Sequence, residues 1–245
     1  MHPLLQSILD TQTVTDGRET YPLTYHMDAA EGRLLQAAVG AVKPRVTLEV
    51  GMAYGISTLF ICEALAELPF QARHIVIDPF QSSDWHSVGL QNVKTAGYEH
   101  LIEMHQEPSE FVLPRLVAAG VQVQLALIDG WHSFDQALME FYFINRMLPV
   151  GGVVLFDDAD RPSVNRVIRY ILTYPAFEVF PVHPPAGPSS LLGRLRRRVT
   201  AMPWLAKVAH PSLAARDWDL DIAHTCVALR KRAEDRRLDT WFQDF

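Results

Sequence analysis

Short apolar runs alternate with longer amphipathic segments from about Val46 to Tyr174, and this alternation constrains the fold more than any other feature. The strand-like runs are VTLEV (46–50), HIVID (74–78), LIEMH (101–105), VQLALID (123–129) and GVVLF (152–156). Segments with a helical pattern lie near 56–67, 87–96, 109–119, 133–147 and 162–174. Continuous apolar strands that alternate with helices predict an α/β fold, with a parallel sheet covered by helices on both faces.

The flanking sequence extends this pattern at both ends. Residues 1–45 are expected to be partly helical, with AAEGRLLQAAVGAV (29–42) as the best helix. FEVFPV (177–182) and HTCVALRK (224–231) are expected to form two further strands. We therefore expect one domain over residues 1–245, with an N-terminal helical segment at 1–45 and an insertion or lid at 183–220.

Composition limits the classes of partner. The formal net charge of -6 argues against nucleic acid as the main partner. No apolar run approaches the roughly 20 residues that span a bilayer, and the N-terminus does not resemble a signal peptide, so we expect a cytoplasmic protein. The basic segment 191–210 could bind a membrane surface or an anionic substrate, but a solvated helix or lid is the favoured interpretation.

The segment EVGMAYGIS (49–57) joins the first strand of the alternating region to the helix that follows it. Gly51 permits a tight turn, and Gly55 lets the helix begin close to the strand. The free N–H groups at the start of that helix suit an anionic group such as a carboxylate, and Ser57 or Thr58 can add a hydroxyl. Glu49 would repel a pyrophosphate but could accept from an ammonium group. The turn therefore favours a zwitterion over a dinucleotide, although an ordinary strand–helix turn remains an alternative.

Carboxylates end three of the other predicted strands. Asp78 follows the second strand, where nucleotide-binding α/β proteins place the acid that binds ribose hydroxyls. Asp129 ends the fourth strand, and Asp157 and Asp158 end the fifth. If these strands are neighbours, their three carboxylates converge and favour a hard cation such as Mg²⁺, Mn²⁺ or Ca²⁺. His132 is near enough to act as a base at neutral pH.

Each of these acids also has a purely structural interpretation. Asp78 could cap a turn before Pro79, and Asp158 could cap the helix that begins near Arg161. Asp157 could contact the cofactor or the substrate directly, and His132 could be a structural donor in its loop. The metal interpretation is preferred because three acids and a nearby histidine form a specific set.

These motifs resemble a known family. EVGMAYGIS is similar to the first motif of class I S-adenosylmethionine-dependent methyltransferases, in the form found in catechol-type, cation-dependent O-methyltransferases. IDGWHSFDQA (128–137) and GGVVLFDDA (151–159) resemble a related bacterial group that includes macrolide-sugar O-methyltransferases. The resemblance covers roughly residues 25–180 and implies a Rossmann-like, seven-stranded sheet whose last strand is antiparallel. The middle glycine of the common glycine-rich motif is Ala53 here, which is usual for the catechol-type form.

The resemblance also implies roles for individual residues. The methionine part of S-adenosylmethionine would lie against the turn, the ribose against the acid of the second strand, the adenine against the loop HQEPSE, and Mg²⁺ or another divalent cation against the three acids. The cofactor-binding residues are then Glu49, Gly51, Met52, Gly55, Ser57, Asp78, Glu107, Ser109 and Asp129; the metal ligands are Asp129, Asp157 and Asp158; the catalytic residue is His132. His132 occupies the position of a catalytic lysine in the catechol-type enzymes, so the identity of the base differs.

The sequence thus predicts methyl transfer to a hydroxyl of a small molecule or a sugar-bearing metabolite. The alternatives are a metal-independent methyltransferase or a related hydroxylase of the same fold, and a non-catalytic cofactor-binding or scaffold protein. A Rossmann dehydrogenase is disfavoured because its glycine pattern is missing. Members of the family often form dimers or larger homo-oligomers, and the resemblance carries that expectation to this chain.

Overall fold

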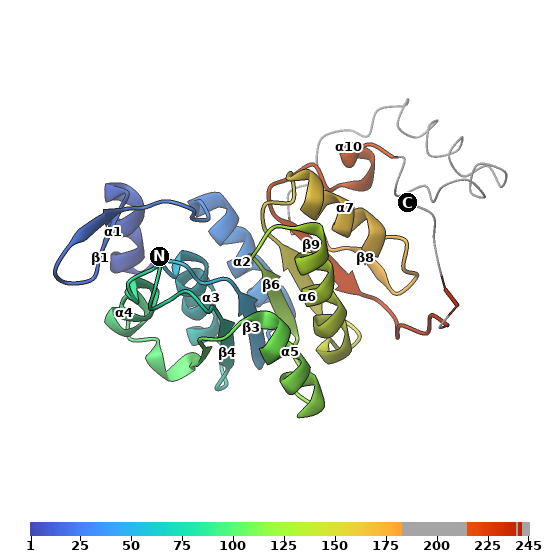
Figure 1. The fold of residues 1–245 in the computed structure, drawn as a ribbon, viewed down its shortest axis with the longest axis horizontal. Coiled ribbons are helices and arrows are strands. Elements are labelled where there is room, and N and C mark those ends of the chain that lie inside the picture. Colours follow the sequence, from blue (N-terminus) through green and yellow to red (C-terminus); the bar gives the residue numbers. More distant parts are fainter. Residues whose placement is uncertain (183–214, 239, 242–245) are drawn as a thin grey trace.

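The structure, a computed structural model, describes residues 1–182, 215–238 and 240–241, and contains the predicted α/β sheet (Figure 1). Seven strands are hydrogen-bonded in the order β5-β4-β3-β6-β7-β9-β8. Their bounds in that order are Ile102–His105, Arg73–Ile77, Val46–Val50, Leu125–Ile128, Val153–Phe156, Val227–Lys231 and Phe177–Val179. The strands from β5 to β7 are parallel, and β9 runs antiparallel to both β7 and β8. The predicted fold class and the antiparallel last strand are confirmed.

Helices cover both faces of this sheet. On one face, α5 (Ser109–Ala118), α6 (Phe134–Met147) and α7 (Pro162–Ile171) pack on a core that includes Leu48 and Val50. On the other face, α2 (Ala29–Val42) and α3 (Ile56–Ala66) pack on alternate residues of the same strands, as do α4 (Val88–Thr95) and α1 (Pro3–Thr11) near the β4 end. This alternation places Thr47 and Glu49 on the α3 side of β3.

Local sequence signals explain where several helices begin. Asp28 caps α2 in a capping box, because its carboxylate accepts from the backbone of Ala30 and Glu31 while the Glu31 side chain accepts from the Asp28 amide. Ser133 caps α6, and Pro162 opens α7 at a position where its missing N–H costs nothing. The loops that precede α6 and α7 carry predicted site residues, namely Asp129, His132, Asp157 and Asp158.

The N-terminal segment contains a small hairpin that the sequence analysis did not predict. β1 (Thr13–Thr15) pairs antiparallel with β2 (Thr20–Pro22), between α1 and α2. A short helix, α10 (Asp217–Leu220), lies before β9, and a 3-10 turn (Glu99–Leu101) lies before β5. The basic segment 191–210 and most of the predicted insertion lie outside the described residues.

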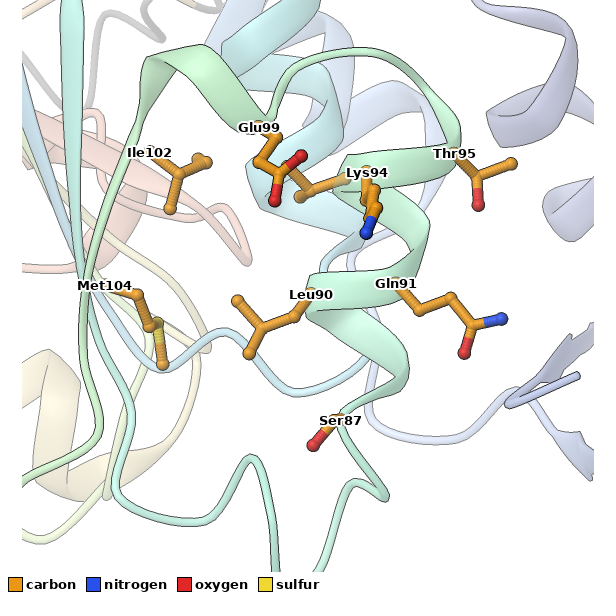
Figure 2. Close-up of a pocket in the computed structure, with 9 residues that line it drawn as sticks. Ser87, Leu90, Gln91, Lys94, Thr95, Glu99, Ile102 and Met104 are labelled. Carbon is orange, nitrogen blue, oxygen red and sulfur yellow. The ribbon is translucent and has the colours of Figure 1, made fainter.

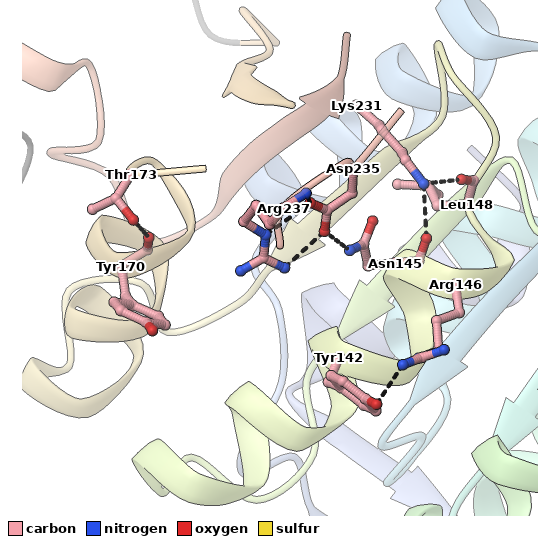
Figure 3. A network of polar contacts seen from close by, with 9 residues as sticks. All are labelled: Tyr142, Asn145, Arg146, Leu148, Tyr170, Thr173, Lys231, Asp235 and Arg237. Atoms are coloured by element: carbon pink, nitrogen blue, oxygen red, sulfur yellow. Dashed lines mark hydrogen bonds and ion pairs between the residues drawn. The ribbon is translucent and has the colours of Figure 1, made fainter. Parts of the chain in front are cut away.

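The segment after β9 returns to α6 and fastens that helix to the sheet (Figure 3). Lys231 donates to the backbone carbonyls of Asn145 and Leu148, at 2.9 and 2.8 Å, where α6 ends. The Asn145 amide donates to Asp235 at 2.8 Å, and Arg237 forms an ion pair with the same carboxylate. α6 is therefore held at its C-terminal end by charged side chains and at its N-terminal end by its cap.

Candidate functional site

The glycine turn lies between the carboxyl end of β3 and the start of α3. Gly51 has a φ of +89°, and a Cβ there would lie 2.1 Å from the carbonyl oxygen of Asp129. Gly55 has a φ of +80° and is the N-cap residue of α3. Met52, between them, is buried in the core against α1 and α4. The chain therefore needs glycine at position 51 both for its backbone angle and for its close approach to the end of β6.

Asp78 lies directly beside this turn and binds its backbone. Its Oδ2 accepts from the amides of Met52 and Ala53, at 3.0 and 2.9 Å, and from the Gln81 side chain. Its Oδ1 accepts from the amide of Phe80 at 2.8 Å. The carboxylate is almost fully buried. The structure brings Asp78 to the predicted crevice, where it orders the turn; the ribose role stays a prediction.

Glu49 is fully buried at the carboxyl end of β3, and the protein itself supplies its partners. Oε2 accepts from Thr58 at 2.7 Å and lies 2.8 Å from Nε2 of His74, while Ser57 donates to Oε1. The other ring nitrogen of His74 lies 2.8 Å from the Thr47 hydroxyl. Glu49 and Ser57, both predicted to bind the methionine part of a cofactor, are thus bound to each other in this structure.

The acids at the ends of β6 and β7 converge as predicted. Nε2 of His132 lies 3.6 Å from Asp129 and 3.2 Å from Asp158. Arg161 forms an ion pair with Asp158 at 2.8 Å, and Oδ1 of Asp157 is buried with no hydrogen-bond partner among the described residues. Adjacent parallel strands create this cluster, because β6 and β7 pair in register up to Ile128 and Phe156.

Burial and mutual repulsion perturb the protonation of this cluster. Desolvation, followed by the charges of Asp129 and Glu31, raises the pKa of Asp157 to about 9. Burial and the charge of Glu49 also raise the pKa of Asp129 well above its usual range. Burial lowers the pKa of His132, although the neighbouring Asp158 opposes that shift. His132 is therefore neutral at pH 7 and able to accept a proton, and the paired acids favour a bound proton or a cation.

The acid cluster has donor atoms that suit a divalent cation. Its donor set consists of carboxylate oxygens, which suit Mg²⁺, and Oδ1 of Asp157 has no hydrogen-bond partner among the described residues and is available as a ligand atom. Within the described residues, however, no group of three His, Cys, Asp or Glu side chains already has the arrangement of a metal site. The residues fit a cation in chemistry, and binding would require their side chains to turn toward it.

The two residues predicted to line the adenine lie in different environments. Glu107 is half-exposed and forms a two-pronged ion pair with Arg115, at 2.7 and 3.0 Å. Ser109, the first residue of α5, is buried and donates to Glu140 at 2.8 Å. The structure therefore places Ser109, but not Glu107, in a buried network beside the crevice.

Three residues of this region were missed by sequence reasoning. His74 pairs with Glu49, Glu140 binds Ser109, and Glu31 lies close enough for its charge to raise the pKa of Asp157. His74 had a detectable signal, since Thr47, Glu49 and His74 are polar residues within otherwise apolar strands. Glu140 had a weaker one, as an acid on the apolar side of a helix rich in aromatic residues.

A surface pocket of the described residues lies away from these acids. It has a volume of about 750 Å³ and lies between α4, the 3-10 turn and the edge strand β5 (Figure 2). Leu90 and Met104 point toward it from opposite sides, and Lys94 and Glu99 line its upper part. None of the predicted site residues lines this pocket, so its size does not identify the functional site.

The strand order, the glycine turn and the acids beyond the carboxyl ends of the strands define the fold of class I S-adenosylmethionine-dependent methyltransferases. A sequence family described as a methyltransferase domain matches residues 48–159. The chain is similar to S-adenosylmethionine-dependent methyltransferases, and among them to the catechol and caffeoyl-CoA O-methyltransferase group.

Curated relatives show the same similarity. The chain is 30% identical over 151 residues to a transmembrane O-methyltransferase homologue of Mus musculus, covering 59% of this chain and 55% of that protein. It is 27% identical over 135 residues to a probable caffeoyl-CoA O-methyltransferase of Arabidopsis thaliana, covering 52% and 53% of the two chains. The chain thus spans about half the length of the curated relatives it matches.

Two solved structures show the same fold. An O-methyltransferase from Bacillus cereus in complex with SAH has a TM-score of 0.60 at 16% identity, covering 72% of this chain and 82% of that one. TomG from Streptomyces achromogenes, an O-methyltransferase of tomaymycin synthesis in complex with SAM, has a TM-score of 0.56 at 21% identity, covering 64% and 74%. Among the described residues of the present chain, no helix is both long and apolar enough to cross a membrane.

Proposed function

We propose that the chain is an S-adenosylmethionine-dependent O-methyltransferase that methylates a hydroxyl of a small molecule or a sugar-bearing metabolite, assisted by a divalent cation. The observation that carries the proposal is the convergence of Asp129, Asp157 and Asp158 with His132 beside the glycine turn. The names of the relatives support an oxygen acceptor, since both curated groups are called O-methyltransferases.

The residues of the crevice would have different roles in such a reaction. Bound S-adenosylmethionine supplies an electrophilic methyl group, and a cation held by the three acids would lower the pKa of the acceptor hydroxyl. His132, neutral because burial lowers its pKa, takes the proton of that hydroxyl at Nε2. Asp158 lies 3.2 Å from Nε2 and stabilises the imidazolium that results. The turn at Gly51 and the acid Asp78 orient S-adenosylmethionine, so that much of the rate comes from aligning its methyl group with the acceptor oxygen.

A metal-independent methyltransferase is the second candidate, and one contact favours it. Arg161 already compensates the charge of Asp158 at 2.8 Å, which reduces the need for a cation. In that case Asp157 would contact the acceptor directly through its unpartnered oxygen, and His132 would act as the base alone.

One assay separates the two candidates. The protein is incubated with methyl-labelled S-adenosylmethionine and a panel of catechols, phenolic acids and hydroxylated glycosides, with Mg²⁺ or with a chelator. The proposal predicts labelled methyl ethers with Mg²⁺ and a loss of at least about 100-fold with the chelator, restored when Mg²⁺ is added back. Equal rates in both conditions would support the metal-independent enzyme.

A further inference from the structure

Glu140 is a buried carboxyl group whose position makes it part of the crevice. It lies on α6 with 1% of its surface exposed, and a Cβ on Gly130 would lie 3.6 Å from its Oε1. Gly130 follows β6 directly, and the same Cβ would lie 3.1 Å from a methyl group of Val50 at the end of β3. Glu140 therefore lies beneath the carboxyl ends of the two central strands, where α/β sheets of this kind bind their ligands.

The hydrogen bonds around Glu140 have a fixed direction. Nε2 of Gln136 lies 3.1 Å from Oε1 of Glu140 and 2.8 Å from the hydroxyl oxygen of Ser109. An amide nitrogen can only donate, and when Glu140 is ionised the flipped amide would place its oxygen against the carboxylate, so Oε1 of the ionised group is an acceptor. The Ser109 hydroxyl, 2.8 Å from that same Oε1, must then donate to it.

This direction determines what Ser109 can offer to a ligand. Its proton is used by Glu140, and one of its two lone pairs accepts from Gln136. One lone pair remains, so Ser109 can only accept a hydrogen bond from the crevice. Burial enforces this arrangement, because a broken bond to Glu140 would leave a desolvated acceptor without a partner.

A second observation shows that the protein does not complete this network by itself. Oε2 of Glu140 is buried and has no hydrogen-bond partner among the described residues. Buried carboxyl oxygens are rarely left unpaired, and an ordered water or a ligand group usually supplies the missing partner. The part of the crevice beside Ser109 and Glu140 can therefore accept a hydrogen-bond donor from outside the chain.

We propose that Glu140 is a positioning residue that holds Ser109 as a hydrogen-bond acceptor, so that the cofactor site selects a purine with an amino group at C6 over one with a carbonyl there. This inference rests on the proposed function, because it assumes that the purine end of S-adenosylmethionine reaches Ser109. It adds a specificity determinant on α6, the helix that lies in sequence between Asp129 and Asp157.

The test compares two ligands that differ at C6. S-adenosylhomocysteine and S-inosylhomocysteine are titrated calorimetrically at pH 8, where Glu140 is ionised, into wild type, Glu140→Gln, Ser109→Ala and the double variant that carries both changes. Glu110→Gln is the matched control, since it removes an exposed carboxylate next to Ser109 but outside the network. In Glu140→Gln the new amide can turn and donate to Ser109, which frees the Ser109 proton to point into the crevice. Thermal unfolding of each variant confirms that it is folded.

In wild type and Glu110→Gln, the adenosyl ligand is expected to bind at least about 10-fold more tightly than the inosyl ligand. Glu140→Gln and Ser109→Ala should each reduce that ratio to about 3-fold or less, and the double variant should reduce it no further. An unchanged ratio in Glu140→Gln, or no preference in wild type, would overturn the inference and leave the proposed function intact. Failure of wild type to bind either ligand would overturn both.

Discussion

Nε2 of His74 and Oε2 of Glu49 lie 2.8 Å apart at a place where neither side chain is exposed to solvent. His74 comes from β4 and Glu49 from β3, and their strands pair in parallel, so the contact joins the two strands through side chains as well as backbone. Thr58 and Ser57 attach α3 to the same carboxylate. Glu49, which precedes the glycine turn, therefore also links β3, β4 and α3 to one another.

Replacing His74 should reveal this link as a loss of stability. His74→Leu leaves the buried carboxylate of Glu49 without one of its donors, and we expect the free energy of unfolding to fall by about 2–4 kcal/mol. Denaturant unfolding of His74→Leu, Glu49→Gln and the double variant measures the coupling, which should be less than additive. Additive losses, or a loss no larger than for the exposed His100→Leu, would show that the pair contributes little.

Adding a single methyl group at Gly51 should disrupt the glycine turn. Gly51→Ala places a Cβ 2.1 Å from the carbonyl oxygen of Asp129 at a φ of +89°, so the turn must distort. We expect a destabilisation of about 3 kcal/mol or more and a loss of cofactor binding. Gly40→Ala is the control, because nothing lies within 4 Å of its added Cβ and α2 gains a better helix former. Equal melting temperatures for the two variants would contradict this reading of the turn.

The raised pKa of Glu140 makes the free energy of unfolding depend on pH. Burial raises its pKa from 4.5 to about 7 in the folded protein. Between these values the folded protein retains a proton that the unfolded chain releases, so the free energy of unfolding falls as pH rises from about 4.5 to 7. Glu140→Gln removes this effect and should be more stable than wild type at pH 8, by on the order of 3 kcal/mol, with little difference at pH 4.

Urea unfolding of wild type and Glu140→Gln at a series of pH values measures that effect. Glu110→Gln serves as the control and should shift the wild-type curve only slightly, since its exposed charge is a minor cause of the raised pKa of Glu140. A constant difference between wild type and Glu140→Gln across pH 4–8 would mean that the carboxyl group does not titrate in this window.

His132 predicts the acid limb of the pH–rate profile. Because burial lowers its pKa below the usual 6.5, activity that needs the neutral ring should fall only below that pH. His132→Gln should lower kcat by about 100-fold with little change in KM for S-adenosylmethionine, and should abolish that limb. Steady-state rates over pH 5–9 check both points. A large rise in KM with unchanged kcat would assign His132 to binding instead.

The sequence was enough to predict the elements that carry periodic signals. Val46–Val50 and Ala29–Val42 have the predicted bounds in the structure, because each combines a clear apolar pattern with a turn or a cap at its ends. The hairpin Thr13–Pro22 was missed, since two strands of three residues are too short to show a period. The strand predicted from His224 begins at Val227, because Thr225 binds the loop after β7 through its carbonyl.

The sequence predicted where the site residues lie in the fold better than it predicted which side chains they contact. Asp129, Asp157 and Asp158 meet because they end neighbouring parallel strands, which is a property of the pattern. The sequence marks His74 and Glu140 as polar residues in apolar surroundings, but it does not assign them to Glu49 and Ser109. Those pairings depend on the register of β3 against β4 and on how α5 packs on α6. Periodicity predicts which face a residue is on, but not which side chain it meets there.

Calorimetric titration with S-adenosylmethionine, with and without Mg²⁺, tests the central claim most directly, using wild type, Asp157→Ala and the exposed control Asp160→Ala. The account predicts one cofactor bound per chain and a separate Mg²⁺ heat that is lost in Asp157→Ala but kept in Asp160→Ala. Cofactor binding without any Mg²⁺ heat would remove the cation and leave methyl transfer with His132 as the base. No binding of S-adenosylmethionine to wild type would contradict the account.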